Sequence, residues 1–323
     1  MPVLNAQKMI KLPTGKVLAV AFDHDAAMCA AGDRDGIIHI LDANTGEIIQ
    51  TLRQHVEFVY CLAFCENNRH LMSAGKDKSI REWDLDTGKL VRDYAGIFSV
   101  SSVHSASTHG IKATAKSHQM TILSLALGPN HTMATSSQDT NVKFWKNGEP
   151  VRTYDWHTEP VTCVRFQPET GILFSASRDK TIRSWNDVNG AVLHRYTGHL
   201  GEIIGLEFLD RDHFVSVDAL GYVNAYEVGQ ESAAAFLYQS SCPIMCVALI
   251  KSEGCLLLGR TDGKIEVLDV NPDSWEEHHE PLTVTHGELV HLKEVRCIAA
   301  HDVHHIVSGD NEGKVIFWDL NLA

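Results

Sequence analysis

The sequence lacks several features that would place it in a specialised class of protein. Its 323 residues contain no apolar stretch near the ~18 residues that a membrane span needs, and the opening MPVLNAQKMIKL has no apolar core of a secretory signal. Positive charge is scarce, since 28 Lys and Arg face 41 Asp and Glu. A net charge of −13 disfavours binding of the whole protein to nucleic acid or an anionic membrane. We therefore expect neither as a partner, and we expect a cytosolic location with the nucleus open.

Motifs for cofactors and covalent chemistry are also missing. The eight cysteines have neither disulfide-scaffold spacing nor the Cys-x2-Cys redox spacing, so reduced thiols are expected. Gly-rich stretches at 259–264 and 309–314 fall one residue short of a phosphate-binding loop and read as hairpin turns. Histidine-rich stretches at 276–280 and 301–305 could bind metal, but without a Cys/His quartet at zinc spacing, solvated loop histidines are favoured. The sequence predicts no metal, no cofactor and no small-molecule substrate.

What the sequence does contain is a repeat. A short run of branched and aromatic residues recurs seven times, each too short for a helix and therefore predicted to be a strand. A second strand, a turn and a third strand follow each run. The third strands end in Trp-Asp or a variant of it, near residues 42, 84, 146, 186, 227, 269 and 319.

These units resemble the WD40-repeat family over nearly the whole chain. The supporting motifs are S-A-x-x-D-K-x-I-R-x-W at 73–83 and 175–185, IFWDL at 316–320, and a His placed 27 or 28 residues before the Trp position in five units. Most intervals between third-strand ends also agree with the ~40–45 residue period of such blades. The resemblance implies an all-β fold, a seven-bladed WD40 β-propeller that forms a single domain over residues 1–323. In this family the N-terminal strand usually completes the last blade, and residues 4–12 suit that role.

Three blades carry a Ser/Thr–His–Asp–Trp set that includes the parts of a hydrolase triad. A set that recurs in three blades favours architecture over catalysis, and the resemblance implies a structural hydrogen-bond chain within each blade. We therefore predict no catalytic residue. The three sets are His55, Ser73, Asp77 and Trp83; His118, Thr135, Asp139 and Trp145; and His157, Ser175, Asp179 and Trp185.

The other four blades depart from this pattern. Blade 5 has Leu220 at the expected Asp position and Tyr226 at the Trp position, and blade 7 has Glu312 at the Asp position. Blades 1 and 6 lack both the His and the Trp. We expect these four blades to depend on apolar packing instead.

Partner-binding residues follow from the family's top face, which is formed by residues beside the first strands and by the residue before the turn Asp. Rigid aromatics and arginines are enriched at binding hot spots, and bidentate arginine contacts suit an acidic or phosphorylated peptide. That these charges merely solvate turns stays an open alternative. The predicted top-face residues are Arg34, Phe58, Tyr60, Lys76, Arg178 and Arg296.

Two insertions enlarge this prediction. Residues 97–117 should form a top-face loop between blades 2 and 3, where either ordering on binding and phosphorylation or a plain surface loop fits the Ser- and Thr-rich composition. Residues 271–281 should form a bottom-face loop, in which Trp275 is expected to be an exposed anchor and a second contact site.

Three functions follow, in decreasing order of support. The first is a non-catalytic scaffold that mediates protein–protein interactions within a multiprotein complex. The second is a reader of acidic or modified (phospho- or methyl-) peptides through the basic and aromatic top face. An enzyme is the third and least supported. The fold alone does not distinguish them.

Overall fold

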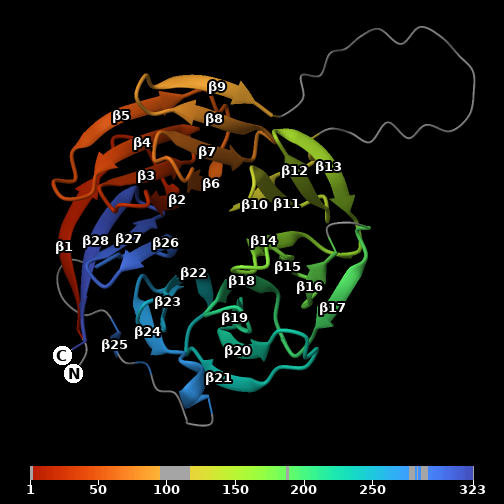
Figure 1. The fold of residues 1–323 in the computed structure, drawn as a ribbon. Helices are drawn as coiled ribbons and strands as arrows, with labels where there is room; N and C mark the ends of the chain where they lie inside the picture. Colours follow the sequence, from red (N-terminus) through yellow and green to blue (C-terminus); the bar gives the residue numbers. More distant parts are fainter. Residues whose placement is uncertain are drawn as a thin grey trace, which may run out of the picture.

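The computed structural model describes residues 3–94, 117–186, 189–275, 281, 283–284 and 290–322. Seven four-stranded antiparallel sheets form the blades of a propeller, arranged in a ring (Figure 1). The described residues include one 3-10 turn, η1 (Pro272–Ser274), and within them no helix is long and apolar enough to cross a membrane. The prediction of a seven-bladed all-β propeller is confirmed.

Each of the first six blades takes four consecutive strands, from the innermost to the outermost. Blade 1 is β2 (Val17–Phe22), β3 (Met28–Asp33), β4 (Ile37–Asp42) and β5 (Ile48–Arg53); blade 2 is β6 (Val59–Phe64), β7 (His70–Gly75), β8 (Ile80–Asp84) and β9 (Lys89–Asp93); blade 3 is β10 (Ile122–Gly128), β11 (Thr132–Ser137), β12 (Val142–Lys146) and β13 (Glu149–Tyr154). Blade 4 is β14 (Val161–Phe166), β15 (Leu173–Ser177), β16 (Ile182–Trp185) and β17 (Val192–Tyr196); blade 5 is β18 (Ile203–Phe208), β19 (His213–Asp218), β20 (Tyr222–Glu227) and β21 (Ala235–Gln239); blade 6 is β22 (Ile244–Ile250), β23 (Cys255–Arg260), β24 (Ile265–Asp269) and β25 (Thr283–Val284).

Blade 7 closes the ring with strands from both ends of the chain. It contains β26 (Val295–Asp302), β27 (His305–Asp310), β28 (Lys314–Asn321) and, at its outer edge, β1 (Val3–Lys11). β1 pairs with β28 from Val3 opposite Asn321 to Lys11 opposite Lys314, and the two termini lie side by side (Figure 1). The predicted closure by the N-terminal strand is confirmed, and it covers the β28 edge that a three-stranded blade would expose.

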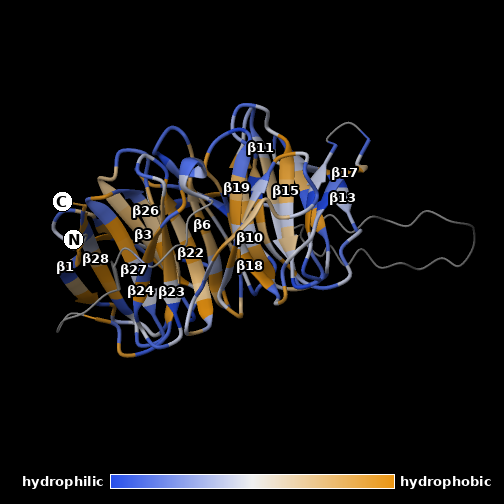
Figure 2. Cartoon of the chain, turned by 90° about the horizontal axis from the view of Figure 1, so that it is seen from below, coloured by the Kyte–Doolittle hydropathy of each residue, from blue (hydrophilic) through white to orange (hydrophobic). Residues whose placement is uncertain are grey.

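The hydrophobic core is divided into seven clusters, each shared by two adjacent blades. The second strands are buried almost throughout, as in β19 and β27, because neighbouring blades cover both of their faces. Outer strands such as β17 alternate buried and exposed residues. Apolar strands fill the ring and polar loops occupy its two faces (Figure 2). The face that carries the turns between second and third strands is called the top face below, and the opposite one the bottom face.

The two predicted insertions are described only in part. The first connects β9 to β10, and of residues 97–117 all but Ser117 lie outside the described residues. The second connects β24 to β25, and its residues 276–280 also lie outside them. η1 and Trp275 form the described beginning of the second connection.

Candidate functional site

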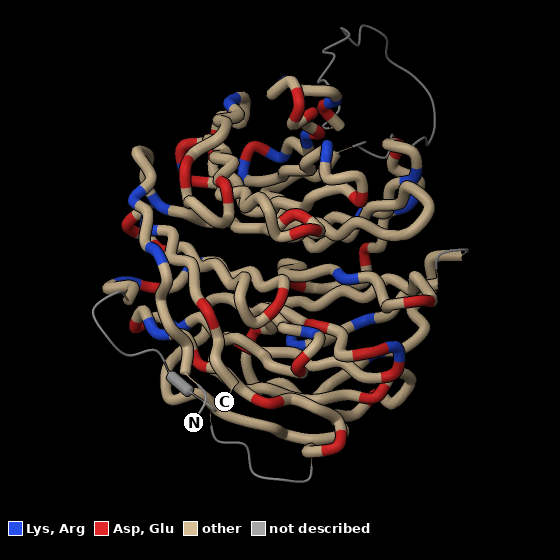
Figure 3. Tube along the Cα trace, turned by 60° about the vertical axis from the view of Figure 1, so that its left-hand side comes forward, with Lys and Arg blue, Asp and Glu red and all other residues tan. Residues whose placement is uncertain are grey.

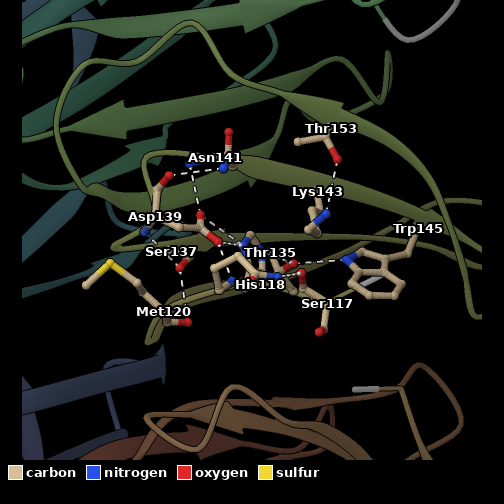
Figure 4. Close-up of polar contacts among 11 residues, drawn as sticks. Ser117, His118, Met120, Thr135, Ser137, Asp139, Asn141, Lys143, Trp145 and Thr153 are labelled. Atoms are coloured by element: carbon tan, nitrogen blue, oxygen red, sulfur yellow. Dashed lines mark hydrogen bonds and ion pairs between the residues drawn. The ribbon is translucent and has the colours of Figure 1, made fainter. Parts of the chain in front are cut away.

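The hydrogen-bond chain of blade 3 runs from the top-face turn to the blade core (Figure 4). His118 donates from Nδ1 to Asp139 Oδ2 over 3.0 Å and accepts at Nε2 from the Thr135 hydroxyl over 2.9 Å. Trp145 Nε1 donates to the same hydroxyl oxygen over 2.9 Å. Every polar side-chain group in this hydrogen-bond chain has a partner, which offsets the free-energy cost of burying it.

Blades 2 and 4 repeat this geometry. His55 lies 2.8 Å from Asp77 Oδ2 and 2.7 Å from Ser73 Oγ, which accepts from Trp83 at 2.8 Å. In blade 4 His157 lies 2.7 Å from Asp179 Oδ2 and 2.8 Å from Ser175 Oγ, which accepts from Trp185 at 2.9 Å.

This geometry cannot serve a hydrolase. The hydroxyl-bearing residues Ser73, Thr135 and Ser175 are 0% exposed. A nucleophile must reach the substrate atom that it attacks, and these hydroxyls are enclosed by the imidazole and the indole that they bind. The three sets hold the turn, the second strand and the third strand of each blade together.

Blades 5 and 7 possess the chain as well, which corrects the sequence-based expectation. His199 lies 3.1 Å from Asp218 Oδ2 and 2.6 Å from Ser216 Oγ. The aspartate therefore comes two residues after the Ser, at the end of β19, and Leu220 plays no part in the chain. Buried Tyr226 replaces the Trp and donates to the Thr197 carbonyl oxygen.

Blade 7 is complete. His291 lies 2.8 Å from Asp310 Oδ2 and 2.7 Å from Ser308 Oγ, and Trp318 Nε1 donates to that oxygen over 2.8 Å. Asp310 again follows its Ser by two residues, so Glu312 is not the functional equivalent of Asp77. The spacing Ser-x-Asp at 216–218 and 308–310 was the signal that could have revealed both aspartates.

Blades 1 and 6 hold buried polar networks where apolar packing was expected. In blade 1 His39 Nε2 lies 3.0 Å from the Thr14 hydroxyl and 3.6 Å from Asp33, and both His39 and Asp33 are buried. In blade 6 buried Arg260 pairs with Asp262 at 2.6 Å and with buried Glu266. Blade 1 thus has a His39–Thr14 hydrogen bond beside Asp33, and blade 6 has a charged group of Arg260, Asp262 and Glu266, in place of the His–Ser–Trp chain.

An aromatic and cationic cluster lies on the top face across blades 1 and 2. Lys76 Nζ lies 4.5 Å from the centroid of the Phe58 ring, and the Arg34 guanidinium lies 5.9 Å from it. Tyr60 meets Phe58 edge to face at 6.0 Å between centroids. The structure therefore brings together four of the predicted top-face residues, which we call the Phe58 cluster: Arg34, Phe58, Tyr60 and Lys76.

Acidic neighbours accompany the top-face cations. Lys76 pairs with Glu57 at 3.1 Å, and Arg34 lies 3.9 Å from Asp35. On blade 7, Arg296 contacts Glu294 at 3.4 Å while its buried Nε has no partner among the described residues. Pairs of this exposed kind are weak, so a carboxylate or phosphate of a partner can compete for the cations. Figure 3 shows acidic and basic residues interspersed along the chain.

Tyr60 links the Phe58 cluster to Arg296 at the channel. Burial raises the pKa of Tyr60, and the positive charges of Arg296 and Lys76 oppose that rise. Tyr60 and Arg296 both line a cavity of about 230 Å³ that is enclosed by the first strands of all seven blades. The cationic surface therefore continues from the top face into the mouth of the channel.

Two predicted partner residues lie elsewhere. Arg178 is on the top face of blade 4, where it contacts Glu202 of blade 5 at 3.4 Å. Trp275 is half-buried, and the expectation of an exposed anchor is wrong. Its indole packs between blades 5 and 6, edge to face with His213 at 5.2 Å between centroids, and donates to the Val270 carbonyl oxygen over 3.1 Å. Trp275 holds its own loop against the propeller.

The channel wall also carries an ion pair that the sequence reading missed. Arg165 Nη2 lies 2.6 Å from Glu207 Oε1, joining β14 to β18. An arginine within the otherwise apolar strand VTCVRF was the available signal. Four cysteines line the same channel, and all eight in the chain are free. Burial raises the pKa of channel thiols such as Cys61 and Cys163, which keeps them protonated and unreactive.

Comparison with known proteins finds WD repeats in this sequence and a similar WD-repeat protein. A family model described as "WD domain, G-beta repeat" matches residues 7–42, 46–84, 111–146 and 148–186. The WD repeat domain-containing protein 83 homolog of Dictyostelium discoideum is 22% identical over 98% of this chain and 86% of its own length.

Other relatives are longer proteins. The U3 snoRNP-associated protein-like EMB2271 of Arabidopsis thaliana is 24% identical over 73% of this chain and 49% of its own length. The DDB1- and CUL4-associated factor 13 of D. discoideum is 30% identical over 47% of this chain and 32% of its own length. The chain thus spans half or less of these two relatives. Four matched repeats, a WD-repeat relative and seven antiparallel blades together show WD40 repeats in a chain that folds as a seven-bladed β-propeller.

Proposed function

We propose that the chain is a non-catalytic scaffold that binds a partner protein through an acidic segment at the Phe58 cluster. WD40 propellers generally bind proteins, and the names of two relatives associate them with the U3 snoRNP and with DDB1 and CUL4. Extending membership of a complex to this chain is an analogy based on the family. Eight free cysteines support a reducing compartment, and we place the protein in the cytosol, with the nucleus open.

The observation that carries this proposal is the contact of the Phe58 ring with two cations. The ring holds Lys76 and Arg34 on the top face, and each cation–π contact of this kind contributes about 0.5–1 kcal/mol at exposed sites. Because the Phe58 ring already restricts the Lys76 and Arg34 side chains, they lose less conformational entropy when they bind an anion. Phe58 thereby positions two cations for carboxylates or phosphates of a partner, with Arg296 as a third at the channel mouth.

A reader of modified peptides is the second candidate, and the cluster favours phosphorylated over methylated peptides. A methyl-lysine cage needs free aromatic faces for the incoming ammonium. Phe58 already contacts the chain's own Lys76 and Arg34. Phosphoserine instead brings three acceptor oxygens and a charge of about −1.5 to −2, which suits a lysine and two arginines.

Peptide binding tests this proposal. The probes are a Glu- and Asp-rich peptide, its phosphoserine form and its Gln/Asn counterpart, titrated into the full chain by fluorescence anisotropy. Lys76→Glu and Arg34→Glu should each weaken binding of the acidic peptide about tenfold, the equivalent of ~1.4 kcal/mol. Lys180→Glu is the matched control, because Lys180 lies exposed at the blade 4 turn, away from blades 1 and 2.

The outcomes separate the two candidates. Equal binding of acidic and phosphorylated peptides supports a plain scaffold, and strong preference for the phosphorylated form supports a reader. Binding of the Gln/Asn peptide at the same affinity, or equal loss with Lys180→Glu, would show that the Phe58 cluster is not the site.

A further inference from the structure

Three potential metal ligands lie together on the bottom face of blade 7, outside the site described above. His301 and Asp302 end β26, and His305 begins β27. Their ligand atoms all lie within 4.8 Å of one another, and none of the three residues is fully buried. We call His301, Asp302 and His305 the blade 7 trio. From the sequence, solvated loop histidines were favoured here, but the structure gives these side chains specific partners.

The two ring nitrogens of His301 face different partners. Its Nε2 lies 3.1 Å from the backbone carbonyl oxygen of His24 in blade 1. A carbonyl oxygen can only accept, so Nε2 donates to it. Nδ1 faces Asp302 Oδ2 over 3.1 Å. Two acceptors at that distance repel one another unless a proton or a metal ion lies between them.

The other two members of the trio are held by neighbouring groups. Asp302 Oδ1 accepts the backbone N–H groups of His304 and His305 over 2.8 and 2.9 Å. The His305 ring packs edge to face on Phe22 of blade 1, with 6.3 Å between centroids, and its Nδ1 lies 2.9 Å from Asp302 Oδ1. The ligand atoms are thus oriented by contacts that do not depend on a metal.

We propose that the blade 7 trio is a zinc site that fixes the β26–β27 turn of blade 7 beside blade 1. Two imidazole nitrogens and a carboxylate suit Zn²⁺, and a backbone carbonyl on the far nitrogen of His301 is the usual support for a metal-binding imidazole. Ligand atoms around tetrahedral Zn²⁺ are roughly 3.3 Å apart. The imidazole–carboxylate separations here are 2.9–3.1 Å, and all three ligand atoms lie within 4.8 Å of one another.

The location explains what the ion would do. All three ligands belong to the β26–β27 turn of blade 7, and the His24 carbonyl and Phe22 of blade 1 contact two of them, so the site lies beside the junction of blades 7 and 1 (Figure 1). His24 and His301 also line a cavity of about 360 Å³ at the bottom of the channel. With three protein ligands, a fourth coordination position is left for water or for a side chain of a partner.

Zinc binding by the intact chain tests the proposal. Metal-free protein is titrated with Zn²⁺ by calorimetry, and Co²⁺ serves as a spectroscopic probe of coordination. We expect one equivalent to bind and to raise the melting temperature. His301→Gln and His305→Gln should each weaken binding at least tenfold and abolish the thermal shift, and circular dichroism without metal checks that each variant folds.

Two controls make the test specific. His304→Gln removes a histidine of the same turn that instead contacts Asp319 at 2.7 Å, and it should leave Zn²⁺ affinity unchanged. The double change His278→Gln/His279→Gln removes the other histidine-rich stretch and should also have no effect. Three results would overturn the proposal: no saturable binding, loss of binding in either control, or undiminished binding by both His301→Gln and His305→Gln. In each case a proton would lie between His301 and Asp302. None of these outcomes bears on the Phe58 cluster, which lies on the opposite face.

Discussion

At the scale of single residues, the position of one carboxylate decides how each blade is tied together. In blades 2, 3 and 4 the residue two positions after the Ser or Thr is not acidic, and the aspartate four positions after the same Ser or Thr reaches the imidazole. Where that residue is itself an aspartate, as with Asp218 and Asp310, it takes the imidazole directly. The same imidazole is thus bound by a carboxylate from either of two backbone positions.

This difference predicts unequal effects of two neighbouring substitutions. Asp310→Ala should lower the free energy of unfolding by about 2–4 kcal/mol, because it leaves buried His291 without its acceptor. Glu312→Ala, at the position that the repeat pattern assigns to the aspartate, should change it by less than about 0.5 kcal/mol. Urea denaturation of the two variants measures both values, and a larger loss for Glu312→Ala would contradict the role given to Asp310.

At the scale of elements, β1 is the strand on which closure depends. It pairs with β28 along its whole length, and buried Leu4 joins the core cluster between blades 6 and 7. Its other residues are mostly exposed or half-exposed. Buried Leu4 and a backbone ladder with one bulge between Ala6 and Lys8 hold β1 in place. Leu12, just after the strand, is buried in the cluster between blades 7 and 1.

Removing this closure should destabilise the propeller. Deletion of residues 1–12 should lower the melting temperature sharply, because it exposes the β28 edge and the apolar side chains beneath it. Leu4→Ala should cost about 2–4 kcal/mol through the cavity that it leaves. Asn5→Ala is the matched control on the exposed face of the same strand and should be nearly neutral. An unchanged thermal transition after the deletion would refute closure by β1.

At the scale of the whole molecule, carboxylates in five blades should make the fold less stable as the pH falls. Burial opposes ionisation of Asp77, yet the hydrogen bond and charge of His55, together with Arg81, lower its pKa to about 2 from an ordinary 3.8. Partner imidazoles and backbone N–H groups likewise lower the pKa of Asp139, Asp179, Asp218 and Asp310. A lowered folded-state pKa stabilises the fold above the unfolded-state pKa, and that stability is lost as the pH falls towards the folded value.

Unfolding by acid should therefore be cooperative and begin below about pH 4. The free energy of unfolding should fall as the pH drops from 4 towards 2, because the aspartates bind protons in the unfolded chain at pH values where they remain ionised in the folded one. Asp77→Asn should flatten this dependence over the same range, and Asp86→Asn, at an exposed turn position of the same blade, should not. Denaturation measured from pH 2 to 7 gives both slopes, and stability that rises on acidification would contradict the assignment.

Much of this molecule follows from its repeat. The seven strand–turn–strand units and their third-strand ends could be read from spacing, because a blade is one supersecondary unit whose contacts lie within about 45 residues. The role of residues 4–12 in closure and the structural nature of the His–Ser–Asp–Trp sets followed from the resemblance to the WD40 family. The repeat pattern did not predict the roles of Asp218 and Asp310 or the buried polar groups around His39 and Arg260. A pattern match assigns residues by position and does not consider which neighbour a side chain contacts.

The sequence by itself determined the blade, since alternation, turn residues and Trp placement are local properties. Only the tertiary structure decided what forms between blades. Phe58 of blade 2 receives Arg34 from the turn of blade 1. Trp275 is half-buried against His213 of blade 5, and His301 is oriented by a carbonyl of His24 at the other end of the chain. These contacts join different blades, so they exist only once neighbouring blades have packed together.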